Sequence, residues 1–536
     1  MTELPAPLDG DLEYDVAIVG YGPGAQALSS LLGRRGRRVI VFERYPGLYN
    51  NARAGHIDHE VLRTVQAVAP ERAVALERTM HPALEEYVWL NAKGETILHQ
   101  PHVTPGKRSV SGWYSDYTLW QPNLEDVFAS VAQETGVEVA FGWEVVGLAD
   151  YGHHATVTAN RVSYDAAGRR DLSDDYRVVR ARFVVGGDGG SSFVRRTLAI
   201  PRDDHGVDEE WLVCDMLTLD PSHRVTPFIA QICDPARPRL VMPLGTSHRR
   251  FEWRVMPGES AASMSRPDTA WRLLSEFGVT PQTHQIARQL VYRFQARTAT
   301  RWRQGNAFLI GDAAHTMPPY AGQGLCGAVR DAANLAWKLD LVLEGLAGDS
   351  LLDTYEEERR AHHSLWTHLS IAEGRISNVL DPEEADKRDQ RLLLEGIPIP
   401  DLPTLEKGFL DADSPAAGDI APQGVVLSGG RRELLESQFP GPRFRLILDG
   451  FAAGDILDGA EQAFLHRLGA DVTTIGGEIV DVDGQYRDWF DEFGVVAVLY
   501  RPDFYVYGTA VDRGAVAGLV SRLRSDLMAT TELSSA

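Results

Sequence analysis

Cysteine is scarce in this chain, with only Cys214, Cys233 and Cys326 among 536 residues. Their wide spacing provides neither a CxxC redox or zinc motif nor the dense cysteine framework of a small secreted domain. No apolar run reaches the roughly 20 residues that a membrane-spanning helix needs, and the acidic residues 1–13 lack the apolar core of a signal peptide. These absences predict a cytoplasmic protein without a disulfide, a metal site or a membrane partner.

Positive charge is also in deficit, because 53 Lys and Arg stand against 75 Asp and Glu, for a formal net charge of −22. The basic residues form no concentrated run, which disfavours nucleic acid and anionic membrane surfaces as partners. What is present is a large apolar fraction, 44% of the residues. A chain of this length can bury two or three domain cores.

The first glycine-rich stretch follows a short apolar strand that begins at Tyr14. A helix to about Arg35 and a second strand, 39–42, complete a βαβ unit. This combination is the dinucleotide-binding fingerprint, in which glycines permit a tight turn and the helix start receives a pyrophosphate. The motif does not distinguish FAD from NAD. Its candidate ligand-binding residues are Gly20, Gly22, Gly24, Ala25 in place of a third glycine, Glu43 and its neighbour Arg44.

Two further motifs follow in order. Residues 186–195, GGDGGSSFVR, come directly after a short apolar strand and contain Asp188. Residues 309–326, LIGDAAHTMPPYAGQGLC, deliver Asp312 from a buried strand to a turn, and a long amphipathic helix follows. Asp312 is suited to accept a hydrogen bond from a polyol hydroxyl. Gly322 and Gly324 permit close approach of a ligand to a helix N-terminus, which favours negative charge.

These three motifs closely resemble those of single-component FAD-dependent aromatic hydroxylases, the para-hydroxybenzoate hydroxylase family, over roughly residues 14–360. Within that family the chain is most similar to 3-(3-hydroxyphenyl)propionate hydroxylases. The resemblance implies an α/β fold with a Rossmann-like FAD domain at 14–200 and 286–400 and a β-sheet substrate domain at 201–285. It further implies a linker at 401–422 and a thioredoxin-like C-terminal domain at 423–536, which here has no redox cysteine.

The resemblance also implies roles for individual residues. Arg53 and Pro319 are expected at the reaction face of the flavin, and His56 is a candidate proton relay, with a capping role as its alternative. The other expected FAD contacts are Gln121, Val145, Asp188, Gly311, Asp312, Gly322, Gly324, Leu325 and Cys326. Substrate candidates are Trp211, Gln231, Met242, Trp253, Pro318 and Tyr320, and for the first four, ordinary sheet packing stays an equal interpretation.

The chemistry implied is hydroxylation of a phenolic small molecule, ortho to its hydroxyl, by FAD, O₂ and NADH or NADPH through a flavin C4a-hydroperoxide. Two alternatives stay open: an epoxidising or Baeyer-Villiger tailoring oxygenase, and a flavin-binding scaffold that does not oxygenate. A flavin-dependent halogenase is disfavoured because the GWxWxIP segment is absent. The sequence leaves open whether the protein is a monomer, a homodimer or a larger homo-oligomer.

Overall fold

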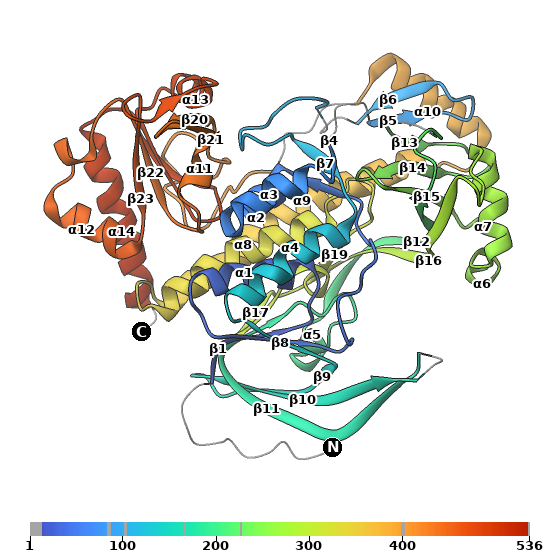
Figure 1. Cartoon of the computed structure of the whole chain (residues 1–536), viewed down its shortest axis with the longest axis horizontal. Helices are drawn as coiled ribbons and strands as arrows, with labels where there is room; N and C mark the ends of the chain where they lie inside the picture. The colour runs from blue at the N-terminus through green and yellow to red at the C-terminus, as the bar shows by residue number, and fades with distance from the viewer. Residues whose placement is uncertain are drawn as a thin grey trace.

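The computed structural model of the chain describes residues 13–82, 87–100, 104–165, 168–223, 225, 228–397 and 403–533 (Figure 1). Its first sheet has the strand order β17-β18-β11-β1-β2-β8, and β9 and β10 extend from β11. From β18 to β8 the neighbouring strands are parallel. Central parallel strands are covered on both faces, which explains the continuous apolar run from Val16 to Val19 in β1. The strands are β1 (Tyr14–Val19), β2 (Val39–Glu43), β8 (Glu138–Phe141), β9 (Trp143–Asp150), β10 (Ala155–Tyr164), β11 (Arg170–Gly186), β17 (Arg303–Gln304) and β18 (Ala307–Leu309).

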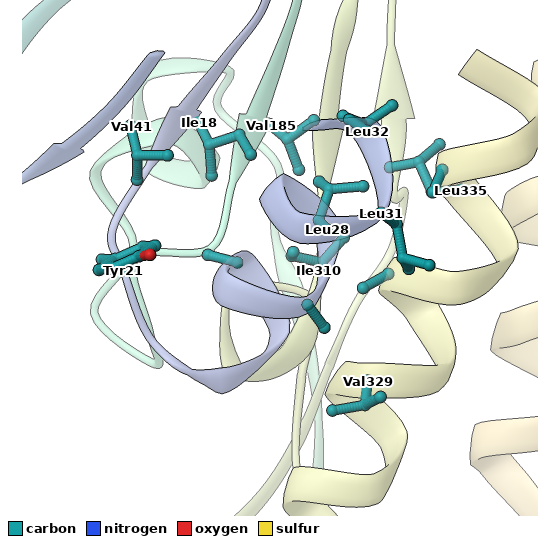
Figure 2. Close-up of a cluster of buried hydrophobic side chains, with 14 of the residues drawn as sticks. Ile18, Tyr21, Leu28, Leu31, Leu32, Val41, Val185, Ile310, Val329 and Leu335 are labelled. Atoms are coloured by element: carbon teal, nitrogen blue, oxygen red, sulfur yellow. The ribbon is translucent and has the colours of Figure 1, made fainter. Parts of the chain in front are cut away.

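Helices α1 (Pro23–Arg34) and α8 (Gly324–Leu343) pack together against this sheet. Proline at the first position of α1 is well placed, because the N–H that it lacks would have no partner there. Apolar residues recur along α1 at helical spacing and enter the core. Figure 2 shows this core, with side chains of α1 between strand residues and α8: Ile18, Leu28, Leu31, Leu32, Val41, Val185, Val329 and Leu335. The expected βαβ unit is thus confirmed.

The second sheet has the order β19-β16-β12-β15-β14-β13-β5-β6. It extends beyond the predicted range 201–285 in both directions. Strand β16 continues to Ala299 because it pairs with β12 along its length, and β5 adds a parallel pair to β13. The sheet thus continues past the predicted boundary at 285, and residues 87–99 also belong to it. The strands are β5 (Tyr87–Leu90), β6 (Thr96–His99), β12 (Arg202–Thr218), β13 (Ile229–Ile232), β14 (Arg239–Leu244), β15 (His248–Arg254), β16 (His284–Ala299) and β19 (His315–Thr316).

Other helices surround the two sheets (Figure 1). The charged segment after α8 forms α9 and α10, and the Asp381 side chain caps the second of these helices. In the described ranges, no helix has both the length and the apolar character to cross a membrane. The helices around the two sheets are α2 (His59–Val68), α3 (Pro70–Glu77), α4 (Gln121–Glu134), α5 (Phe193–Thr197), α6 (Ala261–Met264), α7 (Pro267–Leu274), α9 (Asp353–Ser377) and α10 (Pro382–Glu395). A small sheet joins β3 (His56–Asp58), β7 (Asp116–Thr118) and β4 (His81–Pro82).

The C-terminal unit is coloured orange to red in Figure 1 and has a sheet of order β23-β22-β25-β26. Strands β22 and β23 are parallel and separated in sequence by α12, whereas β25 and β26 are antiparallel. This βαβ plus ββα order is the expected thioredoxin-like arrangement. Its elements are β22 (Arg445–Asp449), α12 (Gly459–Leu468), β23 (Asp471–Ile475), α13 (Gln485–Phe493), β25 (Ala497–Tyr500), β26 (Val506–Ala510) and α14 (Ala515–Leu533), beside a small sheet of β20 (Val425–Ser428), β21 (Arg431–Leu434) and β24 (Val480–Asp481).

The segment expected as a linker, 401–422, packs along the C-terminal unit where it is described. Residues 401 and 402 lie outside the described residues. Backbone amides of Asp411, Gly418 and Ala421 donate to the carbonyls of Tyr507, Val506 and Phe504, at 2.8–2.9 Å. These bonds make the segment part of the surface of that unit instead of a free tether.

Buried ion pairs join the C-terminal unit to the FAD-binding half. The Arg501 guanidinium contacts the Glu358 carboxylate of α9 at 2.8 Å and Asp503 at 2.9 Å. Lys338 of α8 lies 2.9 Å from the same Glu358. Arg63 of α2 donates to Glu436 at 3.0 Å. Because each charge is buried beside an opposite one, loss of one partner would leave the other uncompensated.

The Glu358 carboxylate should make this contact sensitive to acid. Burial alone would raise its pKa, but Arg501 and Lys338 outweigh burial and lower the pKa from 4.5 to about 2. A lowered pKa adds stability that is complete above pH 4.5 and is lost as the pH falls toward 2. The shift corresponds to about 3 kcal/mol.

We expect Glu358→Gln to lose about this much stability at neutral pH and to show a weaker further loss in acid. Urea unfolding at several pH values from neutral to acidic measures the free energy of unfolding of both proteins. If this free energy fell in parallel with pH in the variant and the wild-type protein, the role given to Glu358 would be contradicted.

Candidate functional site

A cavity of about 640 Å³ opens where the parallel strands of the first sheet end. Its wall combines the glycine turn before α1, the turn after β11, the segment between β18 and α8, and one face of the second sheet. The carboxyl edge of a parallel sheet is the usual ligand site of such folds. All three sequence motifs therefore contribute to a single cavity.

One half of the cavity has the features of a dinucleotide cradle. Helices α1 and α8 both begin at its wall, and their N-cap residues, Gly22 and Gln323, make no side-chain capping bond. Their first backbone N–H groups are therefore available to negative charge. A Cβ atom added at Gly22 or Gly324 would meet no atom within 4 Å. This open space beside free amides fits the pyrophosphate and flavin of FAD.

The turns behind this cradle are held together closely. Gly20 has a φ of +88°, and a Cβ atom there would lie 2.6 Å from the Gly187 carbonyl oxygen of the second motif. Glu43 accepts the Tyr21 N–H at 2.9 Å, which fixes the same turn at the end of β2. Asp188 accepts the N–H groups of Phe193 and Val194 at 2.6 and 3.1 Å and so binds the first turn of α5.

One carboxylate oxygen of Asp188 has no hydrogen-bond partner within the described structure. This oxygen, Oδ1, is buried. Burial raises the pKa of this carboxyl, against the hydrogen bonds that it accepts. A buried acceptor without a partner is costly, so a ligand hydroxyl or water would be stabilised there.

Asp312 opens into the cavity at the end of β18. Desolvation by the protein around it raises the pKa of its carboxyl, while His315 and Arg53 act in the opposite direction. The preceding Gly311 N–H donates to Asp331 of α8 at 2.9 Å, which anchors the turn that presents Asp312. A fixed carboxylate at this position is suited to accept a bond from a polyol hydroxyl.

His56 lies under the loop that precedes α8. Its Nε2 atom is 2.9 Å from Asp116 Oδ1, and its Nδ1 atom is 3.3 Å from the Gly322 carbonyl oxygen. Since both partners are acceptors, both ring nitrogens donate when the ring is protonated. Burial lowers the pKa of His56, but Asp116 reverses the effect and the net pKa is raised. The geometry favours a protonated His56 ring that is fixed between Asp116 and the Gly322 carbonyl. The proton-relay role stays a prediction.

Gln121 fixes the loop that carries Arg53. Its Oε1 atom accepts the N–H groups of Arg53 and Ala54 at 2.9 and 2.8 Å. Its amide donates to Glu125 Oε1 at 2.7 Å, which sets the direction of the side chain. Arg53 thereby lines the cavity with its guanidinium 4.9 Å from the centre of the Tyr49 ring.

Most residues predicted from the sequence line this cavity. They are Gly22, Gly24, Ala25, Arg53, His56, Gln121, Trp211, Gln231, Met242, Gly311, Asp312, Pro318, Pro319, Tyr320, Gly322, Gly324 and Leu325. Six further predicted cofactor residues do not form its wall: Gly20, Glu43, Arg44, Val145, Asp188 and Cys326. The individual FAD contacts stay predictions.

Trp253, one of the substrate candidates, does not line the cavity, and its position fits the alternative of ordinary sheet packing. It is fully buried in an apolar core with Phe251, on the face of β15 opposite the cavity. Alternate residues of a strand point to opposite faces. The cavity face of β15 therefore carries Arg250 and Glu252 instead.

The residues predicted from the sequence did not include these two charged residues, nor Arg288 of β16 and Tyr87 of β5, all of which line the cavity. The signal was the alternation of charged and aromatic residues in HRRFEWR, since a strand with charges on a buried face needs a polar partner there. Arg250 has such partners. It donates to Asp215 at 2.7 Å and to the carbonyls of Ala52 and Arg53 at 3.0 and 2.9 Å.

Comparisons with known proteins agree with this geometry. The chain matches a family described as FAD binding domain over residues 13–369 and one described as HcaD C-terminal domain over 418–525. It is 35% identical over 531 residues to the "Probable NADH-specific resorcinol 4-hydroxylase" of Rhodococcus jostii (strain RHA1), with 96% of each chain covered. It is 32% identical to the "3-(3-hydroxy-phenyl)propionate/3-hydroxycinnamic acid hydroxylase" of Escherichia coli (strain K12), with 92% of each covered.

Solved structures share the fold at lower identity. The flavin-dependent monooxygenase PieE, in complex with FAD and substrate, superposes with a TM-score of 0.77 at 21% identity, covering 97% of this chain and 99% of PieE. Aklavinone-11 hydroxylase, in a ternary complex with FAD and aklavinone, gives 0.73 at 23% identity, covering 96% and 100%. The family match, the curated relatives and the cradle at the start of α1 and α8 lead to one conclusion. The chain belongs to the family of single-component FAD-dependent aromatic hydroxylases.

Proposed function

We propose that this FAD-dependent aromatic hydroxylase adds one atom of O₂ to a phenolic ring at the carbon beside the hydroxyl, with NADH or NADPH as the reductant. The balanced reaction consumes a phenol, O₂, a reduced nicotinamide and a proton, and yields a catechol-type product, water and the oxidised nicotinamide. Phenolic substrates in the printed names of both curated relatives support this class.

One observation carries the proposal: a single cavity joins the dinucleotide cradle to the face of the second sheet. Asp312 and Pro319 lie on the cradle side, and Val213, Leu240 and Met242 provide an apolar wall on the sheet side. A planar aromatic ring can thus lie between the flavin position and the sheet. FAD held in the cradle beside Gly22, Gly24 and Gly324 would, once reduced, supply the reactive oxygen to this ring.

The residues of this chain position the ring and keep water away. Met242 and Leu240 remove water from the sheet side, and a dry site slows the unproductive release of peroxide. Pro318 and Pro319 stiffen the loop, and the Pro318 carbonyl accepts a bond from Ser370 at 2.6 Å. This bond ties the expected reaction face to α9.

The nicotinamide has no binding domain of its own, because the sequence contains only one dinucleotide fingerprint. We therefore infer that it reaches the flavin through the same cavity. One relative is named as NADH-specific, so we expect NADH to be the preferred reductant.

Purified enzyme with FAD should oxidise NADH faster when resorcinol or 3-(3-hydroxyphenyl)propionate is added. The experiment compares NADH with NADPH, and NMR of the product locates the new hydroxyl. A product hydroxylated beside the existing hydroxyl, formed in near-equal amount to the NADH consumed, supports the proposal. Consumption of NADH with only peroxide as product across a panel of phenols would contradict it.

A further inference from the structure

Two ionisable side chains face the cavity from the second sheet without hydrogen bonds to the described residues: Glu252 of β15 and Arg288 of β16. Their exposed fractions are only 6% and 9%. Buried charged groups are normally hydrogen-bonded, because removal from water is otherwise costly. The missing partner of both groups is therefore expected in the cavity.

The neighbouring charges do not satisfy this pair. Asp215 is committed to Arg250 through two contacts of 2.7 and 3.1 Å. Arg288 has only an ion-pair contact from its Nε atom to Asp215 at 3.2 Å, and that Nε atom makes no hydrogen bond. Glu252 lies 3.7 Å from Arg250 Nε, which is beyond hydrogen-bond distance. Within the described ranges, Arg288 thus keeps donors without a partner and Glu252 keeps an acceptor without one.

The strand register places these groups beside apolar residues of the cavity wall. Arg288 and Arg250 stand opposite Asp215 on either side of β12, and Glu252 stands opposite Val213. Glu252 is two residues from Arg250 on β15, so both side chains leave the same face. Val213 of β12 and Leu240 of β14 pair with Glu252 and line the cavity beside it. A ring held by these apolar groups would present its polar edge to Glu252 and Arg288.

We propose that Glu252 and Arg288 together bind the substrate's phenol group, Glu252 accepting the hydroxyl proton and Arg288 donating to the oxygen. In the transfer, the phenol O–H bond breaks and an O–H bond forms on the Glu252 carboxylate. The negative charge moves to the phenolate oxygen beside Arg288. The step needs no oxidant, and it rests on the proposed function because a phenolate is the ring form most easily attacked by an electrophilic oxygen.

The charges around Glu252 suit it to accept a proton. Burial raises the pKa of its carboxyl to about 6, helped by Asp215 and opposed by Arg250 and Arg288. Tyr87 also lines the cavity, and burial raises its pKa, so it stays protonated. Glu252 is therefore mostly ionised at neutral pH. An ordinary phenol has a pKa of about 10, and Arg288 is the group that lowers this value for a bound phenol.

The test uses the FAD-loaded enzyme and 4-nitrophenol, whose ionised form is coloured, so that binding is measured without turnover. Arg288→Met should raise the pKa of bound 4-nitrophenol by at least about one unit and weaken its binding about tenfold. Glu252→Gln should lower kcat for the true substrate by about 100-fold and remove the acid limb of the pH profile near pH 6. Matched controls are Glu210→Gln, at an exposed position of β12, and Arg272→Met on α7.

The outcomes separate this inference from the proposed function. If no phenol is hydroxylated but Arg288→Met shifts the bound 4-nitrophenol as expected, the proposed function fails and the phenol site stands. Wild-type kcat and an unchanged acid limb in Glu252→Gln would overturn the role of Glu252. An unchanged pKa of bound 4-nitrophenol in Arg288→Met would overturn that of Arg288. A variant that unfolds is recognised by its circular dichroism and replaced by Glu252→Asp or Arg288→Lys, for which smaller shifts in the same directions are expected.

Discussion

The Asp312→Ala variant is expected to purify with little FAD. Asp312 presents a carboxylate to the cavity from the third motif, whereas the neighbouring Asp331 carboxylate is bound to the Gly311 N–H and does not line the cavity. A hydrogen bond to a charged group contributes about 1.5–3 kcal/mol, so FAD binding should weaken by about 10- to 100-fold. The ratio of flavin to protein absorbance after purification measures the loss directly.

Asp312→Asn provides a graded comparison, because the amide oxygen still accepts a bond but carries no charge. We expect intermediate retention of FAD in this variant. Asp353→Ala, at an exposed position at the start of α9, serves as a control for general effects of removing a carboxylate. Asp312→Ala protein with a full complement of flavin would refute the role given to this residue.

The second large effect is expected at Asp331, the residue beneath the same turn. Asp331 is fully buried and accepts from the Gly311 N–H at 2.9 Å, His315 Nε2 at 2.6 Å and Arg359 Nε at 3.0 Å. Burial would raise the pKa of its carboxyl, but His315 and Arg359 reverse this effect and the pKa is lowered. Asp331→Asn keeps the shape of the side chain but removes its charge. The new amide N–H₂ group would also face N–H donors of the surrounding cluster. Loss of one partner from a buried ionic cluster costs about 3–5 kcal/mol.

Chemical denaturation of Asp331→Asn should therefore show that decrease in the free energy of unfolding. FAD retention should fall as well, because the Gly311–Asp312 turn loses its anchor. Asp340→Asn on the same helix is the matched comparison, since Asp340 pairs with Arg35 and Arg37, which are partly exposed. Equal stability of Asp331→Asn and the wild-type protein would show that the buried cluster is not needed for folding.

The cofactor half of the site was predictable because its signals are local in sequence. The turn at Gly20, the pair Gly187–Asp188 and the pair Gly311–Asp312 each follow an apolar strand and precede a helix. Backbone geometry within a few residues sets these positions. Parallel strand order then brings the three turns to one edge of the sheet.

The substrate half was less predictable because strand partners far apart in sequence build it. The wall includes Tyr87 from before the second motif and Arg288 from beyond the expected domain boundary. Trp253 was a substrate candidate and Glu252 was not, yet the alternation of the strand places the Glu252 side chain at the cavity and Trp253 on the opposite face. Local propensity predicts neither the pairing of β5 with β13 nor which side chains of β15 point to the cavity.

Isotope incorporation from ¹⁸O₂ tests the central claim most directly. The FAD-loaded enzyme would be given NADH and a meta-substituted phenol under ¹⁸O₂ in ordinary water, and the product mass would be measured. Our account predicts one heavy oxygen atom in the ring of each product molecule and none after the same reaction under ordinary O₂ in heavy-oxygen water. A product without the label, or NADH consumption that yields only peroxide with every phenol tried, would contradict it.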